Sequence, residues 1–218
     1  MADIVLADGS ELVREGIVSL LENFPGVNVV ARCSDGRQAV QEVERFRPHL
    51  ALIDLSLPEL NGIDAARQIS RSRTRNRTRV ILMIGHAGEV SLSDMVNAGV
   101  SGCFVKEGSL KELENAVRHP NATLPPLASV GEAGLHNSGT GRMGCELTNR
   151  EREILQLIGE GNPSKQIAAK LNISSTTVKT HRDNIMQKLA AHDVASLTRA
   201  SIRLRLVSAD YRRPAGQV

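Results

Sequence analysis

The chain has 218 residues, of which 41% are hydrophobic and 23% are charged. This composition excludes a largely disordered protein. No apolar run approaches the ~20 residues that a helix needs to span a membrane. The formal net charge of +3 is unevenly distributed, because residues 1–118 carry 14 Lys and Arg against 16 Asp and Glu, whereas residues 146–218 carry 12 against 7. The basic C-terminal part is therefore expected to bind a polyanion.

The N-terminus and the cysteines predict a cytoplasmic protein. Met1–Ala7 is a short apolar stretch with no basic leader, which argues against a signal peptide. Cys33, Cys103 and Cys145 have neither the spacing of metal ligands nor the even number of a disulfide framework, so we expect thiols in a reducing compartment.

Short apolar runs alternate with amphipathic segments through residues 1–118. The expected strands are Ile4–Ala7, Val27–Ala31, Leu50–Asp54, Val80–Ile84 and Cys103–Val105. The expected helices are Glu11–Phe24, Arg37–Phe46, Gly62–Ile69, Val90–Ala98 and Leu110–Arg118. In the first helix the apolar face is expected to comprise Val13, Ile17, Leu20, Leu21 and Phe24. This alternation predicts an α/β domain with a five-stranded, doubly wound parallel sheet of the flavodoxin-like kind.

Residues 119–145 and 146–209 differ from the α/β part. Residues 119–145 are rich in Pro, Gly, Ser and Asn and predict a flexible linker. In residues 146–209 the pattern is all-α: Thr148 and Glu151 form a capping box for the first helix, and Ser174 or Ser175 begins the third. Two short helices joined by a tight turn in a basic domain predict a helix-turn-helix, with a fourth helix over roughly 194–206.

Three polar residues are expected to meet where strands of the predicted sheet end. Asp8 follows the first strand, Asp54 ends the third and Lys106 follows the fifth. A carboxylate beside a divalent cation and a lysine can accept a phosphoryl group, because both cations neutralise the transferring charge. The competing interpretation is that the two Asp residues cap strand ends and Lys106 is a surface cation.

Residues 1–118 resemble the receiver domain of bacterial two-component response regulators. The resemblance lies in VLAD at 5–8, LIDLSLPELNG at 52–62, VILMIGHA at 80–87 and GCFVKEGS at 102–109. It implies that Asp54 is the phosphoacceptor and Lys106 its counter-charge. It also implies a Mg²⁺ site formed by Asp8, Asp54 and the backbone carbonyl of Ser56.

The predicted pocket departs from the family pattern at three positions. Gly9 stands where the family has a second acid, Ile84 where it has Ser or Thr, and Cys103 where it has an aromatic residue. Gly9 offers Mg²⁺ no side-chain ligand, and Ile84 cannot donate a hydrogen bond. We therefore expect a partly degenerate pocket that binds Mg²⁺ weakly and a regulator controlled without phosphorylation. In this hypothesis Lys106 pairs with Asp54 and holds it ionised.

Two alternatives to this hypothesis remain open. Ser10 or Glu11 could reach the metal, and His86 could donate to a phosphoryl group. Asp54 could then receive a phosphoryl group from a histidine kinase in the usual way. In another class of function, the receiver would be a ligand- or protein-sensing module.

Residues 147–189 closely resemble the LuxR-type helix-turn-helix of NarL/FixJ response regulators. The matching elements include Leu147-Thr148, Lys165-x-Ile167-Ala168 and Thr177-Val178-Lys179-x-His181. An α-helix fits the major groove of duplex DNA. The expected DNA contacts are Lys165, Thr176, Thr177, Lys179, Thr180, His181, Arg182 and Lys188. Lys165 and Lys188 could equally belong to a solvated face, and Asp183 could pair with Arg182 or accept from a cytosine amine.

The fourth helix is expected, by resemblance, to form a homodimer through Val194, Leu197 and Ile202. The protein is thus predicted to be a DNA-binding transcription regulator and not an enzyme. Its expected partners are double-stranded DNA, a second copy of the chain, RNA polymerase and, in the phosphotransfer alternative, a histidine kinase. The arginines spaced through Arg71–Arg79 predict an exposed loop or an additional phosphate contact.

Overall fold

The structure is a computed structural model and describes residues 1–71, 78–86, 89–119 and 147–208. These residues divide into two units, 1–119 and 147–208. The predicted linker lies outside the described residues except for His119, as do residues 72–77 of the arginine-rich segment. Within the described ranges, no helix is long and apolar enough to cross a membrane.

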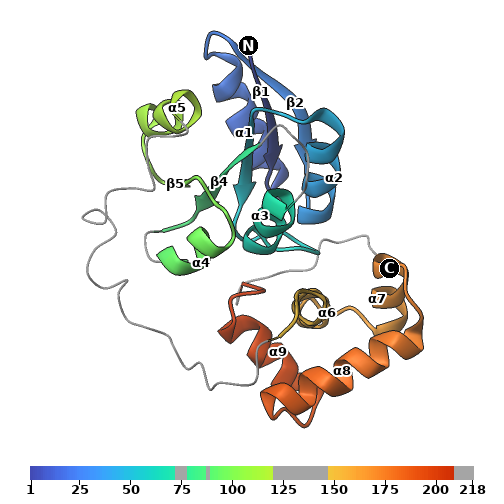
Figure 1. Cartoon of the computed structure of the whole chain (residues 1–218). Helices are drawn as coiled ribbons and strands as arrows, with labels where there is room; N and C mark the ends of the chain where they lie inside the picture. Colours follow the sequence, from blue (N-terminus) through green and yellow to red (C-terminus); the bar gives the residue numbers. More distant parts are fainter. Residues whose placement is uncertain (72–77, 87–88, 120–146, 209–218) are drawn as a thin grey trace. The chain divides into compact units, whose positions relative to one another are not determined.

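The first unit is built on a five-stranded parallel sheet with the strand order β2-β1-β3-β4-β5. The strands are β1 (Ala2–Ala7), β2 (Val27–Cys33), β3 (Leu50–Asp54), β4 (Arg79–Ile84) and β5 (Gly102–Val105). The helices that alternate with them are α1 (Glu11–Glu22), α2 (Gly36–Phe46), α3 (Gly62–Arg71), α4 (Leu92–Asn97) and α5 (Leu110–Arg118). The prediction of a doubly wound parallel sheet is confirmed (Figure 1).

Both faces of the sheet are buried, which explains why its strands are almost continuously apolar. One face packs against α1 and α5 through Ile4, Leu6, Leu52, Met83, Ile17, Leu21, Leu113 and Val117. The other face packs against α2, α3 and α4 through Val5, Ala7, Ile53, Leu82, Val43, Ile63, Ala66 and Met95. Successive strand residues thus enter opposite cores, as the two-residue period of a strand requires.

Helix α1 buries a different face from the one expected. Val13 and Leu20 are 37% and 41% exposed, whereas Val18 is 2% exposed. The expected face was wrong at Val13 and Leu20, because Ile17, Val18 and Leu21 are the residues that contact the sheet. Adjacent apolar positions on a helix do not by themselves indicate which side faces a core.

The second unit contains four helices: α6 (Asn149–Gly159), α7 (Ser164–Leu171), α8 (Ser175–Leu189) and α9 (Val194–Arg203). The predicted capping box is present, with Thr148 and Glu151 bonded reciprocally at the start of α6, and Ser174 caps α8. The core contains residues of all four helices, including Ile154, Leu155, Ile167, Leu171, Val178, Ile185 and Leu197. The predicted all-α helix-turn-helix unit is confirmed.

Helix α9 ends at Arg203, before the expected end near residue 206. The backbone of Arg205 has a positive φ of 55°, and the N–H of Leu206 donates to the carbonyl of Ser201 at 2.9 Å. This turn brings Leu206 and Val207 back into the core, where they are 3% and 8% exposed. Burial of these two side chains outweighs continuation of the helix.

Candidate functional site

Asp8, Asp54 and Lys106 meet at the carboxyl ends of β1, β3 and β5. The Nζ of Lys106 lies 2.7 Å from Oδ2 of Asp8 and 3.0 Å from Oδ1 of Asp54. Both carboxylates are buried, with 1% of Asp8 and 8% of Asp54 exposed. The structure therefore brings the three residues together, and Lys106 bridges both acids where sequence reasoning had paired it with Asp54 alone.

Backbone contacts fix Asp8 and Lys106 in this acidic pocket. The N–H of Asp8 donates to the carbonyl of Cys33 at 3.1 Å, and the N–H of Ser10 donates to Oδ1 of Asp8 at 2.8 Å. The N–H of Lys106 donates to the carbonyl of Ile84 at 2.8 Å, which holds the start of the loop after β5 against β4. Asp8 and Lys106 are thus positioned by the ends of their strands, and Arg14 of α1 adds a side-chain hydrogen bond of 2.8 Å to the carbonyl of Asp8.

The loop after β3 needs a glycine to approach Asp54. A Cβ on Gly62 would lie 2.3 Å from the carbonyl oxygen of Asp54, well inside contact distance. The N–H of Gly62 donates to the carbonyl of Leu55 at 2.9 Å, closing the loop at the start of α3. The glycine eight residues after Asp54 in the sequence is therefore required by a close backbone contact, and not only by the chemistry at Asp54.

Burial dominates the electrostatics of Asp54. Burial raises the pKa of Asp54; the Lys106 ammonium opposes this rise, and the Asp8 carboxylate adds to it. Burial alone would lower the pKa of Lys106, but the carboxylates of Asp54 and Asp8 raise it on balance. The expected pairing of Lys106 with Asp54 is present, and its ammonium favours the ionised form as expected, while burial shifts the pKa of Asp54 further in the opposite direction.

The residues around the pocket fit a magnesium ion poorly. Lys106 already places its ammonium against both carboxylates that were expected to bind the metal. Gly9 provides no ligand, and a Cβ there would lie 3.1 Å from Cδ of Pro58. Within the described ranges, no group of three or more His, Cys, Asp or Glu side chains could hold a metal ion. Mg²⁺ requires near-octahedral oxygen coordination, and Asp8, Asp54 and the carbonyl of Ser56 form an incomplete set.

The residues considered as replacements for missing groups are engaged elsewhere or exposed. The Ser10 hydroxyl accepts from the N–H of Val13 as the N-cap of α1. The His86 side chain is 74% exposed, and Ile84 is buried in the core with 4% exposure. None of these contacts supplies the donor that Ile84 lacks.

Glu89 is a residue of this region that sequence reasoning missed. Its Oε2 accepts from the N–H of Gly85 at 2.6 Å and from the N–H of His86 at 3.3 Å, at the carboxyl end of β4. An acid five residues after a strand matches no motif, so the sequence carried no signal for it. The Glu89 carboxylate thus fixes the backbone at the beginning of the connection between β4 and α4.

Helix α8 carries most of the expected DNA contacts on its exposed side. Thr176, Lys179 and Thr180 are exposed, whereas His181 and Arg182 are partly buried. Thr177 is exposed too, but its hydroxyl lies 2.8 Å from the hydroxyl of the N-cap Ser174. Lys165 is exposed in the first turn of α7. On the same helix, Val178 and Ile185 are buried in the core of the second unit. Helix α8 therefore packs against the core with one side and exposes polar side chains on the other.

Lys188 has a contact within its own unit. Its Nζ lies 2.6 Å from Oε2 of Glu151, whose side chain is 5% exposed. Burial would raise the pKa of Glu151, but hydrogen bonds from Lys188 and Thr148 lower it on balance. The ion pair joins the end of α8 to the beginning of α6, so Lys188 is not on a fully solvated face, and its expected DNA contact stays a prediction.

The three residues expected to form a dimer surface on α9 are not on one face. Val194 and Ile202 are 47% and 37% exposed, but Leu197 is fully buried in the core of its own unit. The assignment of Leu197 to a dimer interface was therefore wrong, because its side chain is needed for packing between α9 and the other helices.

Comparisons with known proteins match both units. Residues 4–118 match the response regulator receiver domain, and residues 146–201 match the bacterial regulatory proteins of the luxR family. The chain is 33% identical over 207 residues to the transcriptional regulatory protein LiaR of Bacillus subtilis (strain 168), covering 93% of this chain and 96% of LiaR. It is 31% identical over 194 residues to the nitrate/nitrite response regulator protein NarL of Escherichia coli (strain K12), covering 86% and 89%.

Solved structures agree with this match. RcsB from Salmonella enterica serovar Typhimurium, bound to promoter rprA in the presence of phosphomimetic BeF3-, aligns with a TM-score of 0.57 at 26% identity, covering 91% of this chain and 96% of RcsB. A LuxR-family response regulator from Aurantimonas sp. SI85-9A1 aligns with a TM-score of 0.54 at 31% identity, covering 59% and 94%.

Proposed function

The chain belongs to the NarL/FixJ family of response regulators, DNA-binding transcription factors with a receiver domain and a LuxR-type domain, and we propose that it is an atypical member controlled without phosphorylation of Asp54. The observation that carries the proposal is the bridge from Lys106 to both Asp8 and Asp54. An ammonium there satisfies the two buried carboxylates that a cation would otherwise neutralise. The bridge supports the proposal together with Gly9 and Ile84, which supply neither a second acid for Mg²⁺ nor a hydroxyl for a phosphoryl oxygen.

The side chains beside the bridge support the same proposal. Ile84, buried at the end of β4, has no hydroxyl for a phosphoryl oxygen. The backbone N–H groups of Gly85 and His86, which directly follow Ile84, donate to the carboxylate of Glu89. These two donors are therefore already used within the chain. We propose that Mg²⁺ binds weakly here for the reasons of coordination given above.

Phosphorylation can be tested directly on the intact chain. We expect no added phosphoryl group in the intact mass after incubation of the folded protein with acetyl phosphate and Mg²⁺. The Asp54→Asn variant, treated in parallel, controls for transfer to other residues. A phosphoryl adduct on the natural chain that disappears in Asp54→Asn would contradict the proposal and establish conventional phosphotransfer, with a histidine kinase as the expected donor.

The DNA interface is proposed to centre on the exposed side of α8. Lys179 and Thr176 lie one turn apart on the exposed helix, and Lys165 adds a cation on α7. Lys and Thr side chains contact phosphates and base edges. We propose that two copies of the chain bind two half-sites, using Val194 and Ile202 on α9 as exposed apolar contacts. RNA polymerase is the proposed partner of the DNA-bound dimer.

Lys179→Gln is expected to weaken binding to a duplex of mixed sequence. If Lys179 neutralises one phosphate, the slope of log K against log salt should fall by about 1. Fluorescence anisotropy over a salt series measures that slope. Lys111→Gln is the matched control, because it removes one exposed charge from α5 of the receiver domain and should leave the slope unchanged. Equal slopes for Lys179→Gln and the natural chain would remove Lys179 from the interface.

A further inference from the structure

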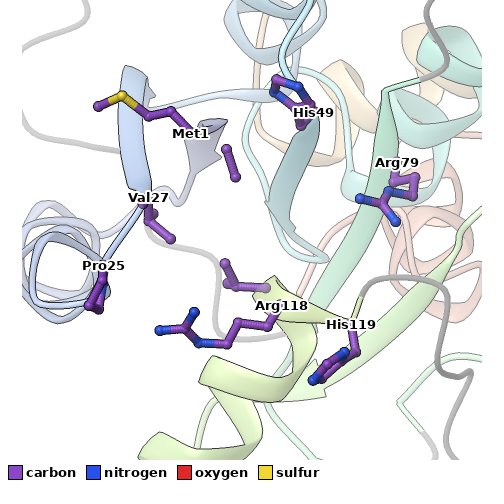
Figure 2. Close-up of a pocket in the computed structure, with 10 residues that line it drawn as sticks. Met1, Pro25, Val27, His49, Arg79, Arg118 and His119 are labelled. Atoms are coloured by element: carbon purple, nitrogen blue, oxygen red, sulfur yellow. The ribbon is translucent and has the colours of Figure 1, made fainter.

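A cavity of about 480 Å³ opens at the edge of the sheet where the strands begin. Val27 and Arg79 are the first residues of β2 and β4, and His49 directly precedes β3. Arg118 and His119, at the end of α5, line the opposite side (Figure 2). Because Asp54 is the last residue of β3, this cavity and the acidic pocket lie at opposite ends of the strands.

The polar side chains that line the cavity are two arginines and two histidines. They are Arg79, Arg118, His49 and His119, and among the described residues no Asp or Glu lines the cavity (Figure 2). Arg118 forms an ion pair with Glu114, in which its Nε lies 2.8 Å from Oε1 of the carboxylate. That bond leaves the two Nη atoms of the guanidinium as donors in the fixed fork that suits carboxylates and phosphates.

His49 has a defined tautomer when it is neutral. Its Nδ1 accepts from the backbone N–H of Asp3 at 3.2 Å. An accepting Nδ1 places the proton of the neutral ring on Nε2. The ring can therefore donate a hydrogen bond to an anion without gaining a charge.

The rest of the wall is apolar. Val27 and Val117 line the cavity, and Val117 is 5% exposed as part of the core beneath α5. Ligand sites in proteins are typically about 300–1,000 Å³ and combine apolar walls with a few convergent polar groups. The size and lining match a small molecule with one anionic end and a compact apolar body.

We propose that this cavity binds a small organic anion, a carboxylate or a phosphate ester with a compact apolar group. The inference goes beyond regulation at Asp54 and does not depend on it. His119 directly precedes residues 120–146, which connect the two units in sequence. A ligand that contacts Arg118 and His119 would therefore bind at the start of that connection, where a signal molecule has a route to the DNA-binding unit.

Histidine resonances of the full chain can locate the ligand. Phenyl phosphate and benzoate are added to protein labelled in its imidazole rings, with neutral benzyl alcohol as the comparison ligand. We expect saturable shifts of His49 and His119 with at least one anion and none with benzyl alcohol. His86 reports on the acidic pocket and His181 on the DNA-binding unit, so shifts confined to either of them would overturn the proposal. The two anions distinguish phosphate from carboxylate recognition.

Variants test whether the arginines bind the anion. Arg118→Gln is expected to weaken binding about tenfold or more, as loss of a charge-assisted hydrogen bond predicts, and Arg79→Gln should act in the same direction. Arg45→Gln is the matched control, because that guanidinium lies over the Phe46 ring on α2 and outside the cavity lining. Melting curves verify that each variant is folded. Unchanged affinity in both folded cavity variants, or no saturable shift in the natural chain, would overturn the proposal.

Discussion

Gly36→Ala is expected to destabilise the receiver domain by about 3 kcal/mol, the upper end of the usual range for overpacking. A Cβ on Gly36 would lie 1.8 Å from the carbonyl oxygen and 2.8 Å from the carbonyl carbon of Leu60. These are backbone atoms of the loop between Asp54 and α3, so they cannot rotate away as a side chain can. Urea unfolding followed by circular dichroism measures the loss.

The matched control for Gly36→Ala is Gly16→Ala. Gly16 lies inside α1, and a Cβ there would have nothing within 4 Å. Alanine has the higher helix propensity, so this variant should gain about 0.5–1 kcal/mol. If the two substitutions changed the free energy of unfolding by similar amounts, the close approach of α2 to Leu60 would not be the cause.

Lys106→Met is expected to cost about 3–5 kcal/mol near neutral pH, the range for removing one partner of a buried ion pair. The change leaves the buried carboxylates of Asp8 and Asp54 without the ammonium that bridges them. Methionine keeps much of the side-chain length, so the loss reports on charge more than on volume. The free energy of unfolding is measured by urea titration at a series of pH values.

The pH dependence of this loss follows from the raised pKa of Asp54. Removing Lys106 removes a cause that lowers this pKa, so it rises further. An acid whose pKa is raised by folding contributes stability below its unfolded pKa, and that stability is lost as the pH rises through the folded value. The cost of Lys106→Met should therefore be larger at about pH 7 than at about pH 4, close to the ordinary pKa of Asp. Lys111→Met, on the exposed side of α5, is the control and should stay within about 0.5 kcal/mol. A cost independent of pH would mean that packing, and not charge, explains the effect.

The fold was predictable because local and global patterns agree in it. Each strand lies between two helical layers and is apolar throughout, as β3 illustrates with five buried residues. The start of α6 was predictable from Thr148 and Glu151, because a capping box is formed by residues close together in the sequence. The buried face of α1 was not predictable, because the choice between Val13 and Val18 depends on how the helix lies on the sheet.

The acidic pocket was predictable from topology, but its energetics were not. Strand ends of a parallel sheet must converge, which placed Asp8, Asp54 and Lys106 together. Whether burial or Lys106 decides the pKa of Asp54 depends on exposure, which no spacing encodes. Contacts between distant residues were missed for a similar reason, as with Lys188 and Glu151, which are separated by 37 positions. The cavity at the start of the strands was missed because its wall comes from several separate segments.

A single oxygen atom of Glu151 connects the beginning of the DNA-binding domain to the end of α8. Oε2 of Glu151 accepts from the N–H of Thr148 at 2.7 Å and from Nζ of Lys188 at 2.6 Å. Thr148 directly precedes α6 at the start of the domain, and Lys188 lies in the last turn of α8. A displacement of Thr148 would pull on the oxygen that anchors Lys188. The first residues of the domain and the last turn of α8 are therefore joined through one carboxylate, so a change at Thr148 is expected to reach Lys188.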